Sequence, residues 1–144
     1  MDITHHFASD TTLSIKTHRR TEMIDITGLV QRVVQNHGIV EGLCMVYVPH
    51  TTAAVTINES ADPDVAHDII YALERLVPAD TPFRHGEGNS DAHVKASLIG
   101  ASEVIAVHEG RLVLGTWQGV FFCDFDGPRS RRFHVHLLSG DPPH

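Results

Sequence analysis

The segments VFFCDF at Val120–Phe125 and FHVHLL at Phe133–Leu138 decide the fold class. Both are short and rich in residues that favour β-strands, and turn residues stand between them. Two further apolar runs precede them at Val104–Val107 and Arg111–Leu114, again with only a turn between. Consecutive strands joined by short turns favour antiparallel or mixed sheets over a parallel βαβ arrangement. The C-terminal third is therefore predicted to be β-structure.

The first half of the chain supplies the remaining strands. Thr11–Thr17 alternates between apolar and polar residues, which is typical of a strand with one solvent-exposed face. Met23–Ile26 is predicted to be a second, short strand. Gly42–Val48 is apolar at odd and even positions alike, which predicts a central strand buried on both faces. Val55 and Ile57 alternate with polar residues in the strand that follows.

Start and stop signals predict three helices, over Thr27–Gly38, Asp62–Pro78 and Ser90–Gly100. A Thr, Asp or Ser cap begins each of them, and a proline follows the cap of the second. The fold class is therefore α+β: a single compact domain of mixed or antiparallel β-sheets packed with two to three helices. The core is expected to contain Val46, Val48, Val55, Ile57, Ile69, Leu73 and Phe121.

Composition limits the class of protein. A chain of 144 residues, 42% hydrophobic and 20% charged, fits one globular domain over residues 1–144, with peripheral tails at 1–10 and 139–144. The 18 acidic residues against 11 Lys and Arg give a net charge of −7, which argues against nucleic-acid binding. The N-terminus lacks signal-peptide features, and no apolar run approaches the roughly 20 residues that span a bilayer. Two cysteines in apolar runs suit reduced thiols, so a cytoplasmic location away from membranes is expected.

The segment RHGEGNSDAH at Arg84–His93 contains no apolar side chain larger than alanine, so core packing does not explain it. The two glycines around Glu87 allow the backbone to turn sharply and to approach a ligand closely. His85 in the loop and His93 in the first helical turn can converge on one point. The segment therefore predicts a binding site, with a solvated connection as the alternative.

Histidine is unusually frequent, at 12 residues. His50 falls at the junction of two predicted strands, and Asn58 and Glu59 stand at the far end of the second; strand ends hold side chains on a rigid scaffold. His134 and His136 share one face of the last strand because side chains alternate. Such a pair suits a metal ion, but a solvent-exposed strand face is the interpretation that we favour.

Arg129, Arg131 and Arg132 are the one concentrated positive charge of the sequence. Guanidinium groups match phosphate oxygens with paired hydrogen bonds, which favours an anion site. A hairpin turn whose arginines offset the nearby acids Asp124 and Asp126 explains the cluster equally well.

Four motifs then occur in order along the chain. They are HTTAA at His50–Ala54 with Asn58–Glu59 and Ala61–Asp64, HGEGNSDAH at His85–His93, LGTWQG at Leu114–Gly119, and DGPR at Asp126–Arg129. Together they resemble the signature of the YjbQ-like family, also named the secondary thiamine-phosphate synthase family. The resemblance runs from about Leu13 to Leu138. It implies a compact α+β domain, usually a homotrimer, with a polar site near the histidines and a capacity to make thiamine phosphate.

The implied reaction and the side chains favour different metal ions. Thiamine-phosphate synthesis couples a pyrimidine pyrophosphate to a thiazole phosphate, and Mg²⁺ is the usual ion for such leaving groups because it prefers oxygen ligands. Three imidazoles instead favour Zn²⁺ or a similar transition ion. A site of three histidines with one open position suits hydrolysis at least as well as transfer.

These arguments give a specific site. We predict that His50, His85 and His93 bind one divalent metal ion, with Glu59 or Glu87 as the acid or base beside it. The residues expected to contact an anionic small-molecule substrate are Thr51, Thr52, Asn58, Asn89, Gln118 and Arg129. Three functions are compatible with this site: a metal-dependent enzyme acting on a small phosphorylated metabolite, a metal-dependent hydrolase, and a non-catalytic trimeric protein that binds a metal or an anion.

Overall fold

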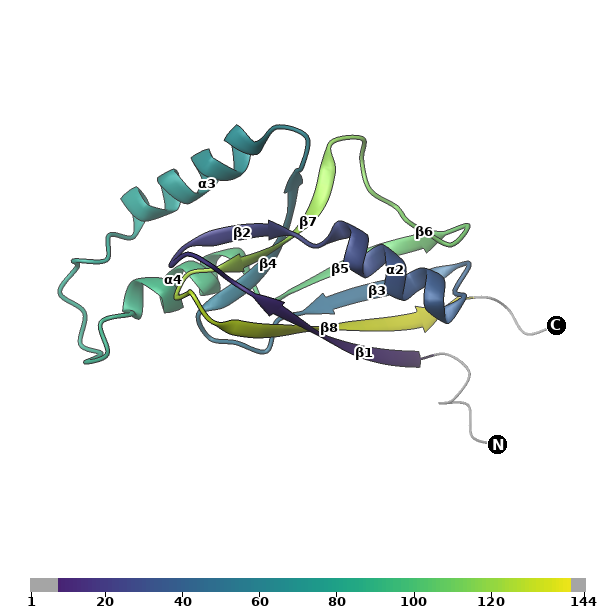
Figure 1. Cartoon of the computed structure of the whole chain (residues 1–144), viewed down its shortest axis with the longest axis horizontal. Helices are drawn as coiled ribbons and strands as arrows, with labels where there is room; N and C mark the ends of the chain where they lie inside the picture. The colour runs from purple at the N-terminus through teal and green to yellow at the C-terminus, as the bar shows by residue number, and fades with distance from the viewer. Residues whose placement is uncertain (1–7, 141–144) are drawn as a thin grey trace.

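The computed structural model describes residues 8–140. Within that range the chain forms two sheets and three helices, and every strand pair is antiparallel (Figure 1). The α+β class predicted from the sequence is confirmed.

The larger sheet has five strands in the order β1-β8-β3-β5-β6. Their bounds are β1 Ala8–Lys16, β8 Ser130–Ser139, β3 Gly42–Tyr47, β5 Ser102–His108 and β6 Arg111–Leu112. The first and last strands of the chain are neighbours, paired from Ala8 opposite Leu138 to Lys16 opposite Ser130. This pairing continues past the strands, because the backbone N–H of Thr17 donates to the carbonyl of Arg129 at 2.9 Å.

The smaller sheet has three strands in the order β2-β7-β4, with β2 at Glu22–Asp25, β7 at Gln118–Asp124 and β4 at Ala53–Glu59. The β4–β7 pair runs from Ala53 opposite Asp124 to Glu59 opposite Gln118. Seven residues in extended conformation separate the two ends of this pair by roughly 20 Å. Each end positions a different set of polar side chains.

Three helices join these strands: α2 at Thr27–His37, α3 at Pro63–Leu76 and α4 at Ser90–Ile99. α2 buries Val30, Val33 and Val34 against strands of both sheets, and α4 packs against β4. α3 lies along β2 and β4 and has no fully buried residue (Figure 1). Its start is as predicted, because Asp62 Oδ1 accepts a hydrogen bond from the N–H of Asp64 at 2.9 Å.

Four of the predicted core residues are buried, in two separate clusters. Val46, Val48 and Val55 belong to the cluster that both sheets share, and Phe121 belongs to a second cluster with residues of α4. The other three predicted core residues, Ile57, Ile69 and Leu73, are only partly buried. Ile69 and Leu73 lie on α3, which covers one side of the small sheet and has no further layer outside it among the described residues.

Two predicted caps are wrong. The residue that caps α2 is Ile26, and the hydroxyl of Thr27 instead donates to Asp25 Oδ1 at 2.6 Å, a local bond that competes with capping. α4 begins after Asn89, and no side-chain cap bond is present there. The signals located both helices correctly but misidentified the capping residue by one position.

β3 is not buried on both faces as predicted. It is central to the large sheet, but only one of its faces meets the core. Leu43 and Tyr47 on the other face are 45% and 38% exposed. His134 and His136 lie beside them on the same outer face, where Thr12 contacts His134, so the interpretation as a strand face is confirmed.

The predicted tails are shorter than expected. Residues 8–10 belong to β1 and Ser139 belongs to β8. Residues 1–7 and 141–144 lie outside the described part of the chain. Between residues 8 and 140, the helices are too short or too polar to cross a membrane.

Candidate functional site

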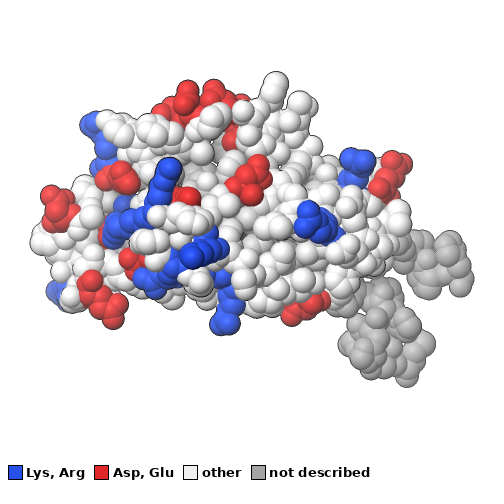
Figure 2. All heavy atoms as spheres, in the orientation of Figure 1, with Lys and Arg blue, Asp and Glu red and all other residues white. Residues whose placement is uncertain are grey.

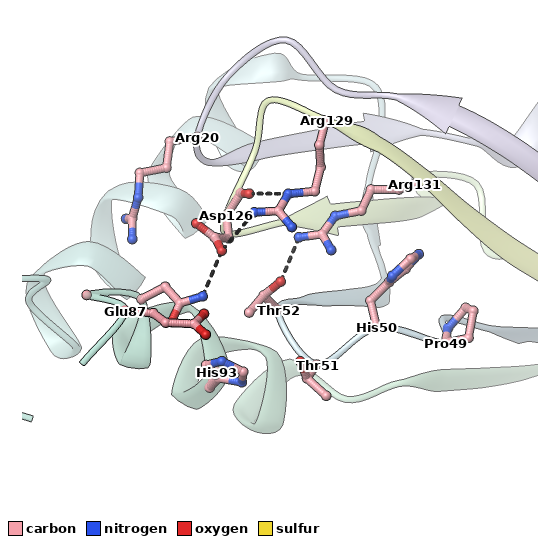
Figure 3. A pocket seen from close by; sticks show the side chains of 12 residues that line it. Arg20, Pro49, His50, Thr51, Thr52, Glu87, His93, Asp126, Arg129 and Arg131 are labelled. Carbon is pink, nitrogen blue, oxygen red and sulfur yellow. Dashed lines mark hydrogen bonds and ion pairs between the residues drawn. The ribbon is translucent and has the colours of Figure 1, made fainter. Parts of the chain in front are cut away.

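One polar cavity of about 720 Å³ gathers most of the predicted site residues. It lies where the β1–β2, β3–β4 and β7–β8 connections meet the loop before α4 (Figure 3). Its lining consists of Arg20, Pro49, His50, Thr51, Thr52, Glu87, Gly88, Asn89, His93, Asp126, Arg129 and Arg131. We call this cavity the arginine pocket.

Positive charge gathers in this region although the chain as a whole is acidic. Figure 2 shows Lys and Arg side chains grouped where β8 begins and the β1–β2 turn lies, with Asp and Glu side chains among them. Three arginines against Glu87 and Asp126 give the cavity lining an excess of positive charge, and such an excess attracts ligands of the opposite sign. The arrangement therefore favours an anionic ligand.

Arg131 is held in the pocket by a fully buried carboxylate. The side chain of Asp124 accepts hydrogen bonds from Arg131 Nε at 3.3 Å and Nη2 at 2.8 Å, and both side chains are almost completely buried. Asp124 also accepts from the Thr17 hydroxyl at 2.7 Å and from the N–H of Asp126 at 3.0 Å. Arg131 Nη2 donates further to Thr52 Oγ1 at 2.7 Å (Figure 3). Each buried charge thus has a partner, as low-dielectric burial requires.

Gly127 allows the turn beside this ion pair to pack closely. A Cβ atom at this position would lie 2.7 Å from Thr17 Oγ1 and 2.9 Å from Asp124 Oδ2, and it would collide with the carbonyl of Arg19. Only glycine fits there without displacing the backbone. The DGPR motif therefore has a packing role beneath the pocket as well as supplying its arginine.

A second buried carboxylate fixes Arg20 on the other side of the pocket. Asp91 accepts bonds from Arg20 Nη1 at 3.1 Å and Nη2 at 3.0 Å, and from Lys95 Nζ at 2.9 Å. Burial alone would raise the pKa of Asp91, but the hydrogen bonds from Arg20 and Lys95 outweigh it and lower the pKa to about 2. Asp91 lies in the first turn of α4, and its side chain is the buried partner of two cations.

Arg129 lies in the turn before β8, and its side chain is much more exposed than that of Arg131. Its Nη2 donates to Asp126 Oδ2 at 3.1 Å and its Nε donates to the Asp126 carbonyl at 2.9 Å. Asn89 Nδ2 donates to the same carboxylate oxygen at 2.9 Å. Arg129 and Arg131 offset local acids, as the hairpin interpretation expects, and both also line the pocket; their binding of an anion stays a prediction.

His50 stands at the edge of the pocket in the neutral state. Burial and the neighbouring Arg131 guanidinium lower the pKa of His50 from its ordinary value of 6.5. Its Nε2 lies 3.1 Å from both the amide nitrogen and the carbonyl oxygen of Arg132, so the backbone can satisfy either tautomer. A neutral imidazole is able to accept a proton or to bind a metal ion.

The three predicted metal ligands are only partly brought together. The rings of His85 and His93 meet edge to face with centroids 5.6 Å apart, and Glu87 Oε2 lies 3.6 Å from His85 Nε2. His50 instead contacts the Arg132 backbone across the pocket. Among residues 8–140, no three His, Cys, Asp or Glu side chains are arranged to hold a metal ion. The structure places two of the three predicted imidazoles in contact, and His50 lines the same cavity as His93; metal binding by the three histidines stays a prediction.

Three of the predicted site residues lie at the opposite end of the β4–β7 pair. Glu59 lines a separate cavity between α3 and the small sheet. Asn58 Oδ1 accepts from the N–H of Glu59, and Gln118 Oε1 accepts from the N–H of Gly115 at 2.7 Å. Within one chain these residues are therefore separated from the arginine pocket by the length of β4.

The residues predicted from the sequence include most of those that line the pocket, but not all of the charged side chains in and behind it. It identified His50, Thr51, Thr52, Glu87, Asn89, His93 and Arg129, all of which line the arginine pocket. It gave no role to Arg20, which no motif marks, or to Lys95, whose burial beside Asp91 is set by tertiary packing. Asp124 was noted as a local acid, but its burial depends on the β1–β8 pairing.

Neither cysteine contributes to the site. Cys44 and Cys123 are free and buried. Burial raises the pKa of the Cys44 thiol to about 11 and that of Cys123 to about 12, so both are protonated thiols at neutral pH.

Comparison with known proteins agrees with the motif resemblance. A family model described as "UPF0047 protein YjbQ-like" matches residues 11–140. The UPF0047 protein YugU of Bacillus subtilis is 50% identical over 128 residues, which cover 88% of this chain and 97% of YugU. A UPF0047 protein of Methanocaldococcus jannaschii is 51% identical over 124 residues, which cover 86% of this chain and 90% of the relative.

Solved structures share the fold. An uncharacterized conserved protein of the YjbQ/UPF0047 family from Clostridium acetobutylicum superimposes with a TM-score of 0.87 at 48% identity, over 89% of this chain and 98% of that one. A YbjQ-like protein of unknown function from Sulfolobus solfataricus gives a TM-score of 0.88 at 34% identity, over 92% and 97% of the two chains. The architecture is therefore shared over nearly the whole described chain.

Replacing Asp91 by asparagine should remove a pH-dependent part of the stability. Because the pKa of Asp91 is lower in the folded state than its ordinary value of 3.8, the unfolded state binds more protons as the pH falls. The resulting stabilisation is complete above about pH 4, is lost as the pH falls towards about 2, and amounts to about 2 kcal/mol. Urea unfolding across this pH range measures it.

The matched control is Asp68→Asn, since Asp68 is an exposed aspartate on α3. Asp68→Asn should keep the wild-type loss of stability on acidification, whereas Asp91→Asn should lack this component. Equal pH profiles for Asp91→Asn and the wild type would show that the buried carboxylate contributes nothing in acid.

Proposed function

Because the chain belongs to the YjbQ-like UPF0047 family, we propose that it is an enzyme acting on a small phosphorylated metabolite bound in the arginine pocket. One observation carries the proposal: three arginines, two histidines and a glutamate line a single polar cavity. Cations held in fixed positions bind phosphoryl oxygens, and imidazole and carboxylate groups move protons. Both requirements of phosphoryl or pyrophosphoryl chemistry are met in one place.

Hydrogen bonds to neighbouring carboxylates orient Arg129 and Arg131 for binding an anion. Arg131 donates hydrogen bonds to Asp124 and Thr52 through Nε and Nη2, and its Nη1 forms no hydrogen bond with a described residue. Arg129 likewise uses Nε and Nη2 for Asp126, and its Nη1 has no partner among residues 8–140. The carboxylates therefore orient each guanidinium while leaving one amino group for the ligand. Such preorganisation lowers the entropy cost of binding.

The imidazole and carboxylate groups that line the same pocket are the candidates for proton transfer. His50 is neutral at pH 7 because its pKa is lowered, so its imidazole can take a proton from a reacting group. His93 and Glu87 line the same cavity and are the other candidates for the acid and the base. Glu59 takes part only if a second protomer brings it to this pocket, because within one chain it lines another cavity.

The thiamine-phosphate synthase reaction implied by the family resemblance is one reaction of this class. Its two substrates both carry phosphate groups, which the arginines would orient. Hydrolysis of a phosphate ester at the same site is the second candidate, favoured by the solvent-accessible Glu87 beside His85. Loss of turnover with retained ligand binding in Glu87→Gln would distinguish either enzyme from a non-catalytic binding protein.

Inorganic phosphate should bind in the arginine pocket. The variant Arg129→Met should lower the affinity for phosphate at least about tenfold, because it removes one charge-assisted contact. Isothermal titration calorimetry at pH 7.5 measures both proteins. Arg111→Met is the matched control, because Arg111 is an exposed arginine on β6 outside the pocket. Absence of phosphate binding to the wild type, or an equal loss in both variants, would contradict the proposal.

We further propose that a divalent metal ion, zinc in preference to magnesium, binds at His85 and His93, the two imidazoles in contact beside the pocket. An ion there would polarise a phosphoryl oxygen. The steps assigned above to the arginines, His50 and Glu87 do not depend on it. His50, the third predicted ligand, would complete the set only by leaving the Arg132 backbone.

Elemental analysis of the purified protein tests the metal. His93→Ala should abolish bound zinc with the fold intact, and binding should weaken as the pH falls below about 6.5, since protonated imidazole cannot ligate. His67→Ala, which removes an exposed histidine on α3, should leave the zinc content unchanged. A full complement of metal in both His85→Ala and His93→Ala would show that any ion binds elsewhere.

The homotrimer implied by the resemblance is retained as a proposal, and exposed apolar side chains support it. Tyr71 and Leu76 on α3 are 54% and 71% exposed, and Trp117 beside β7 is 62% exposed. Each is a large apolar side chain that one chain leaves exposed, and contact with a neighbouring protomer would bury it. Light scattering should give three times the chain mass of 15.9 kDa, and a monomer at micromolar concentration would contradict the proposal.

A further inference from the structure

We infer that the ligand has two chemically different parts, a phosphate group in the arginine pocket and an uncharged organic body in a neighbouring pocket. This inference rests on the proposed function and specifies its substrate class. It comes from a second cavity of about 520 Å³. That cavity is lined by His50, Thr51, Ala53, His93, Ala96, Ser97, Gly100 and Ala101, and we call it the alanine pocket.

The two pockets share His50, Thr51 and His93. In Figure 3 the arginines lie in the upper part of the arginine pocket, and Thr51 and His93 lie in its lower part. The shared residues are therefore a boundary, with guanidinium groups on one side and the alanine pocket on the other. A ligand that occupies both pockets places its connecting bond beside the two imidazoles.

The chemistry of the two pockets differs sharply. None of the described residues that line the alanine pocket is Asp, Glu, Lys or Arg, whereas five such residues line the arginine pocket. A charged group in the alanine pocket would lose hydration without gaining an ionic partner. The part of the ligand that binds there is therefore uncharged.

Small side chains give the alanine pocket its volume. Ala53 and Ala96 are 1% and 8% exposed, so they form an inner wall that is fixed by the protein core. Gly100 and the exposed Ala101 border the opening. Burying a ring or a compact aliphatic group against such a wall is favourable in proportion to the apolar area removed from water. The substrate class is thus a phosphate ester of a compact, uncharged organic group.

Calorimetry with inorganic phosphate and phenyl phosphate tests this class. The wild type should bind phenyl phosphate at least about tenfold more tightly than inorganic phosphate, since only the ester has an apolar body to bury. Phosphoethanolamine, whose body carries a positive charge, should show no such advantage. Equal affinities for inorganic and phenyl phosphate would overturn the inference.

The variant Ala101→Leu tests whether the organic body of the ligand binds in the alanine pocket, because Ala101 is exposed and, of the two pockets, lines only that one. This variant should lose the preference for phenyl phosphate and keep the wild-type affinity for inorganic phosphate. Ser97→Leu, a change on the exposed face of α4, is the second variant and should act in the same way. Ala79→Leu, an exposed alanine outside both pockets, should change neither affinity.

The results separate this inference from the proposed function. Phosphate binding without a preference for phenyl phosphate overturns the two-part ligand and leaves the proposed function standing. A preference that Ala101→Leu and Ser97→Leu both retain also overturns it, because the organic body then lies elsewhere. No binding of either compound to the wild type removes the proposed function and the inference together.

Discussion

The buried ion pair between Asp124 and Arg131 is the interaction on which the candidate site depends. Its carboxylate joins Thr17, which follows β1 and is 107 residues away in sequence, to the β7–β8 connection, where Asp126 and Arg131 lie two and seven residues beyond Asp124. Removing both charges from water is costly, and the geometry repays that cost only because each polar atom of the carboxylate has a hydrogen-bond partner. The same bonds present Thr52 and the remaining donors of Arg131 to the pocket. The stability of the fold and the proposed ligand binding therefore both depend on one carboxylate.

The polar motifs of the chain serve two separate places. The HTT, HGEGNSDAH and DGPR segments meet around the arginine pocket, which the β1–β8 pairing and the start of α4 bring together. Asn58, Glu59 and Gln118 lie at the other end of the β4–β7 pair, next to α3 and the exposed Trp117. A symmetric assembly that placed this end of one protomer beside the pocket of another would unite the two sets, because ring-forming contacts join different surfaces of identical chains. The proposed homotrimer and the proposed enzyme are therefore connected.

Much of this structure could be predicted from local sequence signals. Alternation placed β1 and β8, and Asp62 with Pro63 marked the start of α3, since both signals act within a few residues. The outer face of β3 was missed, because an apolar residue such as Leu43 looks the same whether or not another layer covers it. The roles of Arg20, Asp91 and Lys95 were missed for a related reason: a buried ion pair exists only after distant segments meet. His50, His85 and His93 were predicted to share a metal ion because each lies in a motif at the boundary of an element. That prediction stays open, since the motifs do not fix the direction in which His50 points, and its ring contacts the Arg132 backbone.

The most direct test of the central claim is the phosphate affinity of Asp124→Asn, measured beside its stability. The account predicts a loss of about 3–5 kcal/mol in the free energy of unfolding, because the variant leaves the Arg131 charge buried without a partner. It also predicts phosphate binding at least about tenfold weaker in the folded variant, since Arg131 is no longer oriented. Thr17→Val, which removes one bond to Asp124 and the bonds of the same hydroxyl to the Arg129 backbone but keeps the ion pair, provides a milder version if Asp124→Asn does not fold. Wild-type phosphate affinity in a folded Asp124→Asn protein would show that the buried carboxylate does not prepare the site, and would contradict the account.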